Sequence, residues 1–387
     1  MTGTVGSFEF ATATRIIFGA GTVADLPGVV AALGSRVLAC TGRNAERHEL
    51  FESLKLPVEI VAVHGEPTVQ AVREAVERCT AFGADVVLAV GGGSVMDLGK
   101  AVAMLRGNGG DPLDYLEVIG RGTPIRRPSV PLIAVPTTAG SGAEVTANAV
   151  LSSPEHERKA SLRARSMLPS VALVDPLLTL SCGSAVTAAS GLDALTQCLE
   201  PFVSPFATPL TDLFAVEGIR LAAGALRTLH LLPDDVPART DMALASLLGG
   251  LALANAKLGA VHGLAGVIGG QLPVAHGAIC AALLAPVSEV NVRVLKDRAP
   301  ESDALRRYAT AARLLTGSAT ATVDDGLAWM RETVAMLGIP GLTGLGLPTT
   351  DTERLHSIAT MAATSSSMRG NPVPLTSAEL HECLVGS

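Results

Sequence analysis

The sequence has few aromatic residues and few charges, and both shortages exclude classes of function. Phe, Trp and Tyr make up 3% of the 387 residues, so aromatic platforms that stack on nucleic-acid bases are not expected. Charged residues make up 17%, the net charge is −7 and no basic tract occurs, which argues against a nucleic-acid partner. The sequence therefore favours a small-molecule ligand and no nucleic acid.

Long hydrophobic runs are also missing, although 48% of the residues are hydrophobic. The longest uncharged apolar run, Met242 to Ala256, is shorter than the ~20 residues that span a bilayer; it predicts a buried helix. The first residues show neither a basic region nor an apolar core, so no secretion signal is visible. The six cysteines form no C-x-x-C pair, which fits reduced thiols. We expect a cytoplasmic protein with no membrane association.

The hydrophobic pattern changes near Gly183. Before it, short β-branched runs alternate with helix-like segments such as Val69–Cys79, which predicts a largely parallel sheet covered on both faces. After it, Ala- and Leu-rich segments with helical spacing predict a helical domain. We therefore predict an α/β domain over residues 1–183 and an all-helical domain over residues 184–387. The predicted strands are Arg15–Phe18, Arg36–Cys40, Val58–Val63, Val86–Val90, Leu132–Val135 and Val171–Val174.

Three consecutive glycines and a serine, Gly91 to Ser94, follow an apolar strand and precede a helix-like segment. Backbone N–H groups and the helix dipole at such a turn favour an anion, and they suggest a phosphate-bearing cofactor. The run matches neither standard glycine-rich nucleotide motif. The alternative is a tight strand-to-helix connection in which glycine merely tolerates a positive φ.

A second loop, Val135 to Glu144, also follows an apolar strand and offers hydroxyls from Thr137, Thr138 and Ser141. Hydroxyl and N–H groups suit ribose or pyrophosphate oxygens, whereas an ordinary loop would use them for local hydrogen bonds. Ligands of open α/β sheets bind beyond the carboxyl ends of the strands, where both loops would lie. Together the two loops favour a cofactor site.

The helical half contains candidate metal ligands. Asp193 and Gln197 are four residues apart, so they share one face of a helix that Pro201 is expected to end. His262 and His276 are each followed by glycine in apolar surroundings. Neutral imidazole is a common metal ligand; the alternatives are core histidines bonded to backbone carbonyls and a solvated Asp–Gln pair.

Over nearly its whole length the chain resembles the iron-containing (group III) alcohol dehydrogenases, a family that shares its fold with glycerol dehydrogenase and maleylacetate reductase. The resemblance implies a dinucleotide-binding α/β domain followed by a helical metal- and substrate-binding domain, a dehydroquinate synthase-like fold. The segments that carry it are Phe18-Gly-Ala-Gly, Gly91-Gly-Gly-Ser-x-x-Asp97-x-x-Lys100, Pro136-Thr-Thr-Ala-Gly-Ser-Gly-Ala-Glu144, Gly191-x-Asp193-Ala-Leu-Thr, His262-Gly-x-Ala, His276-Gly and Gly370-Asn-Pro372.

The resemblance implies that one aspartate and three histidines hold Fe²⁺ or Zn²⁺. Asp193, His262 and His276 match three of these positions, and Gln197 stands where the family has the remaining histidine. A family histidine thought to assist proton transfer is Gly266 here. A glutamine carbonyl is a harder and weaker donor than imidazole. Two interpretations stay open: a weakened metal site that includes Gln197, or a metal-independent enzyme like the maleylacetate reductases.

The resemblance also implies a nicotinamide cofactor, NAD or NADP. Asp97 would steady the first loop, and a lysine matching Lys159 reaches the cofactor in the family. Family members specific for NAD often carry aspartate where Gly42 stands, and Arg43 follows it, so NADP is permitted. The implied cofactor-binding residues are Gly42, Gly91, Gly92, Gly93, Ser94, Asp97, Thr137, Thr138 and Lys159.

The expected reaction is hydride transfer between a nicotinamide and a small aldehyde, ketone or alcohol, assisted by a metal that polarises the substrate oxygen. Without metal, His262 or His276 would donate the proton or hydrogen bond. A metal-independent maleylacetate reductase-like enzyme is the alternative. The lyase dehydroquinate synthase and a catalytically silent nucleotide-binding protein are more remote. The family implies a homo-oligomer, commonly a dimer, and no residue identifies the substrate.

Overall fold

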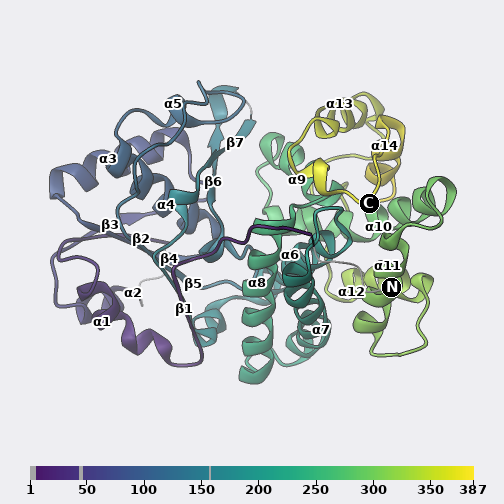
Figure 1. Cartoon of the computed structure of the whole chain (residues 1–387), viewed down its shortest axis with the longest axis horizontal. Helices are drawn as coiled ribbons and strands as arrows, with labels where there is room; N and C mark the ends of the chain where they lie inside the picture. Colours follow the sequence, from purple (N-terminus) through teal and green to yellow (C-terminus); the bar gives the residue numbers. More distant parts are fainter. Residues whose placement is uncertain (1–5, 43–46, 157) are drawn as a thin grey trace. The chain divides into compact units, whose positions relative to one another are not determined.

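The chain folds into two compact units (Figure 1), each described by itself below. A computed structural model describes residues 6–42, 47–156 and 158–387. One unit comprises Ala11–Thr138 and Gly142–Ser181; the other comprises Met1–Phe10, Ala139–Ser141 and Cys182–Ser387. The predicted division at residue 183 stays a prediction.

The first unit is built on a six-stranded sheet with the order β1-β8-β5-β4-β2-β3, in which every pairing is parallel. The predicted parallel-sheet fold is thus confirmed, with strand ends that move by at most one residue. The strands are β1 (Arg15–Phe18), β2 (Val37–Thr41), β3 (Val58–Ala62), β4 (Val86–Gly91), β5 (Leu132–Pro136) and β8 (Val171–Val174).

Both faces of this sheet are buried because successive side chains of a strand point to opposite faces. Val37 and Ala39 of β2 join one apolar cluster, whereas Leu38 and Cys40 join the other. The first cluster includes side chains from α1 and α2, and the second includes side chains from α3 and α4. The helices of this unit are α1 (Leu26–Ala31), α2 (Arg47–Ser53), α3 (Val69–Phe82), α4 (Gly93–Asn108) and α5 (Pro112–Tyr115).

An antiparallel hairpin, β6 (Asn148–Ser153) with β7 (Arg158–Arg163), was not among the predicted strands. Its strands carry many polar residues, which hide the signal of a buried run. Their alternation is nevertheless regular, since Ala149 and Leu151 are buried on one strand and Ala160 and Leu162 on the other. These four side chains extend the cluster that also holds α3 and α4.

From Ser184 onward the chain contains helices and no strand, which confirms the helical second half. Polar N-caps begin several helices: Thr208 before α7, Asp235 before α8 and Thr322 before α12 each accept a backbone N–H at the first turn. The helices are α6 (Ser184–Val203), α7 (Pro209–Leu231), α8 (Val236–Ala256), α9 (Ala260–Gln271), α10 (His276–Arg298), α11 (Asp303–Thr316), α12 (Val323–Met336), α13 (Thr352–Ala363) and α14 (Ser377–Val385).

Two helices differ from simple expectations. Helix α6 continues past Pro201 to Val203, so the prediction that this proline ends the helix was wrong. The proline removes one helical hydrogen bond, to the carbonyl oxygen of Gln197, but only two helical residues follow it. Helix α10 is long and apolar enough to cross a membrane, but 78% of its most apolar window is buried inside the structure. It is therefore a core helix of this unit.

Candidate active site

The first predicted cofactor loop joins strand β4 to helix α4 across a single residue, Gly92. A Cβ atom on Gly91 would lie 2.4 Å from Cγ2 of Val95, so the turn leaves no room for a side chain there. The tight turn brings the N-terminus of the 16-residue α4 to the carboxyl edge of the sheet. A helix N-terminus carries partial positive charge and N–H groups without helical partners, which favours an anion.

The second predicted loop lies directly beside the first. The N–H of Thr137 donates a hydrogen bond to the carbonyl oxygen of Gly91 at 2.9 Å. A Cβ atom on Gly92 would lie 3.3 Å from Oγ1 of Thr138. Pairing of β4 with β5 therefore brings Thr137 and Thr138 against the glycine turn.

The neighbouring strands β2 and β4 send their following helices to opposite faces of the sheet. Phe51 of α2 packs into one apolar cluster and Leu98 of α4 into the other. Where helices reverse in this way, α/β proteins bind nucleotides at the carboxyl ends of the two strands. Gly42 follows β2 at this edge, since Thr41 pairs with Val90 of β4. Arg43, the second residue of the NADP prediction, lies outside the described residues.

The two motif residues that follow the glycine turn lie on α4. Lys100 is fully buried, and its ammonium donates to Oγ1 of Thr146 at 2.7 Å and to the carbonyl oxygen of Asn148 at 2.9 Å. Burial lowers the pKa of Lys100 to about 8, against the opposing charges of Asp97 and Glu144. Lys100 therefore ties α4 to the segment that leads into β6.

Lys159, which the resemblance places near the cofactor, lies on β7. Its ammonium is 3.1 Å from Oε1 of Glu66, and its side chain is 9% exposed. This ion pair gives Lys159 a fixed partner within the α/β unit.

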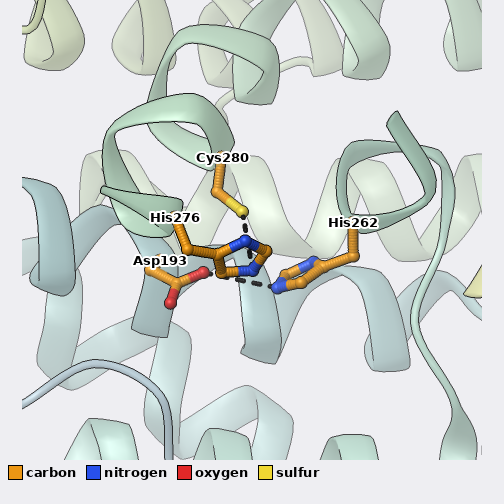
Figure 2. Close-up of side chains that lie close together, drawn as sticks. All are labelled: Asp193, His262, His276 and Cys280. Atoms are coloured by element: carbon orange, nitrogen blue, oxygen red, sulfur yellow. Dashed lines mark hydrogen bonds and ion pairs between the residues drawn. The ribbon is translucent and has the colours of Figure 1, made fainter. Parts of the chain in front are cut away.

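The predicted metal ligands gather in the helical unit, as Figure 2 shows. Asp193 comes from α6, His262 from α9 and His276 from the first residue of α10, and Cys280 joins them one turn further along α10. One possible donor atom from each of the four lies within 4.8 Å of all the others. This is the one group of three or more His, Cys, Asp or Glu residues with such spacing in the described part of the chain.

Glycines allow the helices to approach this closely. A Cβ atom on Gly277, beside His276, would lie 2.6 Å from the carbonyl oxygen of Ala189 on α6. Likewise, a Cβ atom on Gly259, before α9, would lie 2.9 Å from Oε1 of Glu200. The histidine–glycine pairing seen in the sequence thus has a packing reason at α10.

The distances inside the cluster are short. Nε2 of His262 lies 3.3 Å from Oδ1 of Asp193, and Nε2 of His276 lies 3.5 Å from Sγ of Cys280. The two imidazole rings are 5.5 Å apart between centroids. All four side chains therefore direct their donor atoms at a common point (Figure 2).

Glu200 orients one of the imidazoles. Its Oε2 accepts a hydrogen bond from Nδ1 of His262 at 2.7 Å, and its Oε1 accepts from the N–H of Val261 at 2.8 Å. A carboxylate accepts but does not donate, so Nδ1 of His262 carries a proton and Nε2 is the nitrogen that faces Asp193. Carboxylate–histidine pairs of this kind support metal-ligating histidines.

Three atoms in this region are buried without a hydrogen bond: Oδ1 of Asp193, Nε2 of His262 and Oε1 of Gln197. The 3.3 Å contact between the first two lacks hydrogen-bond geometry. Buried polar atoms are normally paired, and leaving one unpaired costs free energy. A divalent cation would satisfy oxygen and nitrogen donors at once, so the residues present fit a metal.

The groups around the cluster shift the pKa values of its members in the direction that favours positive charge at the site. Burial alone would lower the pKa of His262, but Cys280, Glu200 and Asp193 outweigh it and hold that pKa well above its usual value. Cys280 raises the pKa of His276 to about 9 against burial. Burial likewise opposes the shift at Asp193, yet contacts with both imidazoles hold its pKa below its usual range. The site attracts positive charge.

Two residues of this site were missed as candidates. Glu200 lies seven residues after Asp193 and Cys280 four residues after His276, which places each pair on one helix face. That spacing was visible in the sequence, but only the meeting of α6, α9 and α10 gives the two residues a common target. Gly266, at the position of the family's proton-transfer histidine, is exposed, and a Cβ atom there would meet nothing within 4 Å.

Paired loops at the carboxyl edge of a parallel sheet and a buried cluster of possible metal ligands on helices are the arrangement expected of a dinucleotide-dependent enzyme with a metal centre. Comparison with known proteins identifies it further. Residues 13–176 match the family model for iron-containing alcohol dehydrogenase, and residues 187–386 match the C-terminal model of the Fe-containing alcohol dehydrogenase family. The chain belongs to the iron-containing alcohol dehydrogenase family, and it is an oxidoreductase of the alcohol dehydrogenase type.

Individual relatives agree with this assignment. The chain is 33% identical to a choline dehydrogenase of Bacillus subtilis over 359 residues, which cover 90% of this chain and 88% of the relative. The crystal structure of a 1,3-propanediol oxidoreductase is 30% identical, with a TM-score of 0.89 over 98% of this chain and 99% of its own. A sulfoacetaldehyde reductase from Bifidobacterium kashiwanohense, solved with NAD⁺, is 26% identical, with a TM-score of 0.84 and 98% coverage of both chains.

Proposed function

We propose that this enzyme transfers hydride between NAD and a small alcohol or carbonyl compound at a metal centre held by Asp193, His262 and His276, with Gln197 beside them. The observation that supports this proposal is that three possible metal-ligand atoms, Oδ1 of Asp193, Oε1 of Gln197 and Nε2 of His262, are buried and make no hydrogen bond. A metal-independent enzyme would leave Oε1 of Gln197 unpaired, at a cost of about 1–3 kcal/mol, and would leave Asp193 and His262 with only their 3.3 Å contact. The metal-assisted function is therefore favoured over the maleylacetate reductase-like alternative.

The cofactor would occupy the crevice at the carboxyl ends of β2 and β4. The glycine turn offers N–H groups and the end of the α4 dipole to the pyrophosphate. Thr137 and Thr138 offer hydroxyls beside it, and Gly42 leaves space near the ribose. Lys159 would exchange its contact with Glu66 for the cofactor. Because no acidic side chain stands at Gly42, NADP is also admitted, and NAD is the choice supported by the NAD⁺-bound relative.

In the helical unit, Glu200 keeps the Nδ1 proton of His262 in place, so Nε2 is the nitrogen that would bind a cation in exchange for its proton. Asp193 contributes negative charge, and the buried surroundings exclude water that would screen it. When bound, a divalent cation supplies Lewis acidity that polarises the substrate oxygen and stabilises the charge developed during hydride transfer.

The test is an assay of the purified enzyme with NADH or NADPH and a panel of small aldehydes and maleylacetate, before and after chelation and after addition of Fe²⁺ or Zn²⁺. We expect cofactor oxidation that falls on chelation and returns with metal. Undiminished activity after complete metal removal would support the metal-independent alternative. Absence of oxidation of either cofactor under every condition would overturn the reductase proposal and leave nucleotide binding alone.

The remaining properties are also proposals. We propose a cytoplasmic homo-oligomer, commonly a dimer in this family, that acts on a small molecule. The reduced cysteines of the described chain support the compartment, since none forms a disulfide. Light scattering of the full chain tests the oligomer, and a molar mass equal to the 39.4 kDa monomer would contradict it.

A further inference from the structure

We infer that Cys280 replaces the missing histidine as the fourth protein ligand, through its thiolate, and that the site is consequently selective for zinc. This inference rests on the metal site proposed above and concerns only which residues hold the cation. The thiol loses its proton to solvent when the sulfur binds.

Two distances between donor atoms in the cluster match those expected around a zinc ion. Tetrahedral zinc with bonds of about 2.05 Å to nitrogen or oxygen and about 2.3 Å to sulfur places N and O ligands about 3.3 Å apart and N and S ligands about 3.6 Å apart. The observed contacts are 3.3 Å for His262 Nε2 to Asp193 Oδ1 and 3.5 Å for His276 Nε2 to Cys280 Sγ. Two edges of the cluster thus have the lengths that a shared zinc ion requires.

The position of Cys280 in the fold also suits a ligand. Cys280 lies one turn beyond His276 on α10, so the helix that presents one ligand also presents the other. Its side chain is fully buried in the cluster. Cys198, by contrast, is equally buried on α6 but packs at α7 and α8, where its Sγ lies 2.4 Å from a Cβ atom built on Gly218.

The sulfur of Cys280 is a stronger metal donor than the amide oxygen of Gln197. Gln197 offers a neutral amide oxygen, whereas Cys280 offers an anionic sulfur, and soft thiolate ligands favour zinc over Fe²⁺. The donor set Asp–His–His–Cys therefore differs in kind from the aspartate and three histidines implied by the family resemblance. Four protein ligands still permit catalysis when zinc expands to five-coordination.

The main experiment measures metal–sulfur bonding without reference to activity. The full-length protein is loaded with Co²⁺ for absorption spectroscopy and with Zn²⁺ for X-ray absorption. We expect a thiolate-to-cobalt charge-transfer band in the near ultraviolet and one sulfur neighbour at about 2.3 Å from zinc. A zinc shell of nitrogen and oxygen alone would overturn the inference, while the metal-assisted function would stand. Failure of the protein to bind either ion would overturn both.

Variants separate ligation from packing. Cys280→Ser should lose the charge-transfer band and bind zinc roughly 10–100-fold more weakly, whereas the matched control Cys198→Ser should keep the band. The double variant Cys280→Ser with Gln197→His should regain affinity without regaining the band, because imidazole is restored at the family position. A band that persists in Cys280→Ser would contradict the inference. In competition between Zn²⁺ and Fe²⁺, Cys280→Ser should lose part of the wild-type preference for zinc.

Discussion

At the scale of single residues, the site depends on one carboxylate that touches no substrate. Glu200 accepts both the Nδ1 proton of His262 and the N–H of Val261. It thereby fixes the ring at the beginning of α9, holds a proton on Nδ1 and leaves Nε2 to face Asp193. Positioning residues of this kind act through the ligand that they hold.

Replacing Glu200 by glutamine tests this role. Glutamine can still accept the Val261 N–H through its carbonyl, but its amide group cannot accept the His262 Nδ1 proton. We expect zinc affinity, measured by competition with a chromophoric chelator, to fall roughly 10–100-fold. Glu217→Gln on α7, where the carboxylate pairs with Arg220 at the surface, is the matched control. Equal affinities of Glu200→Gln and the wild type would contradict the role.

The pH dependence of metal binding follows from the imidazoles. The pKa of His276 is raised from 6.5 to about 9 by Cys280, so the metal-free protein carries a proton there at neutral pH. A cation must displace that proton, and affinity should therefore rise with pH up to about 9, by as much as about tenfold per unit for each proton displaced. Calorimetric titrations between about pH 6.5 and pH 9 measure it. A flat profile would contradict the raised pKa.

At the scale of elements, α4 connects the two predicted cofactor loops to the rest of the α/β unit. Its first residue follows the glycine turn, and Lys100, two turns on, bonds to Thr146 and Asn148. A fully buried ammonium is costly unless it is hydrogen-bonded. Lys100 thus holds α4 to the segment that follows the second loop and leads into β6.

Lys100→Met should destabilise the protein. Methionine keeps the apolar stem but leaves Thr146 and the carbonyl oxygen of Asn148 without their donor and Glu144 without a nearby cation. We expect a loss of about 1–3 kcal/mol in the free energy of unfolding by urea. Lys296→Met, at an exposed position on α10, should change it by less than about 0.5 kcal/mol. If both variants unfold at the same urea concentration, Lys100 has no such structural role.

The whole molecule consists of two compact units with separate chemical tasks. The α/β unit contains the loops expected to hold the nucleotide, and the helical unit contains the cluster of possible metal ligands. Each ligand should stabilise the folded chain by binding it and not the unfolded chain.

Metal removal should therefore lower the thermal stability of the whole protein. At a free zinc concentration of 100 times the dissociation constant, binding contributes about 2.7 kcal/mol, which corresponds to roughly 5–10 °C in Tm for a unit of this size. Differential scanning calorimetry of chelated and zinc-loaded protein measures this shift. NADH added to chelated protein should raise Tm independently. If zinc leaves Tm unchanged at saturation, the native structure has no metal site.

The sequence by itself determined most of the sheet and the helical second half. The six parallel strands are apolar runs, and their signal is local because both faces of such a strand are buried. The hairpin β6–β7 was not predicted because its polar residues obscure the alternation of buried and exposed side chains. That alternation indicates a strand only once one face of the hairpin is known to be covered. The family resemblance also singled out Asp193, His262 and His276 as metal ligands, whereas their spacing alone left core histidines as an open alternative.

Only the tertiary structure decided what surrounds those residues. Cys280 and Glu200 carry no motif, and their relevance arises from the packing of α6, α9 and α10 around one point. The family resemblance pointed to Gln197 at the position of a missing histidine, whereas the folded chain brings the sulfur of Cys280 within 3.5 Å of His276 Nε2. Helical periodicity fixes which residues share a face, but the donors that meet across three helices are set by how those helices pack.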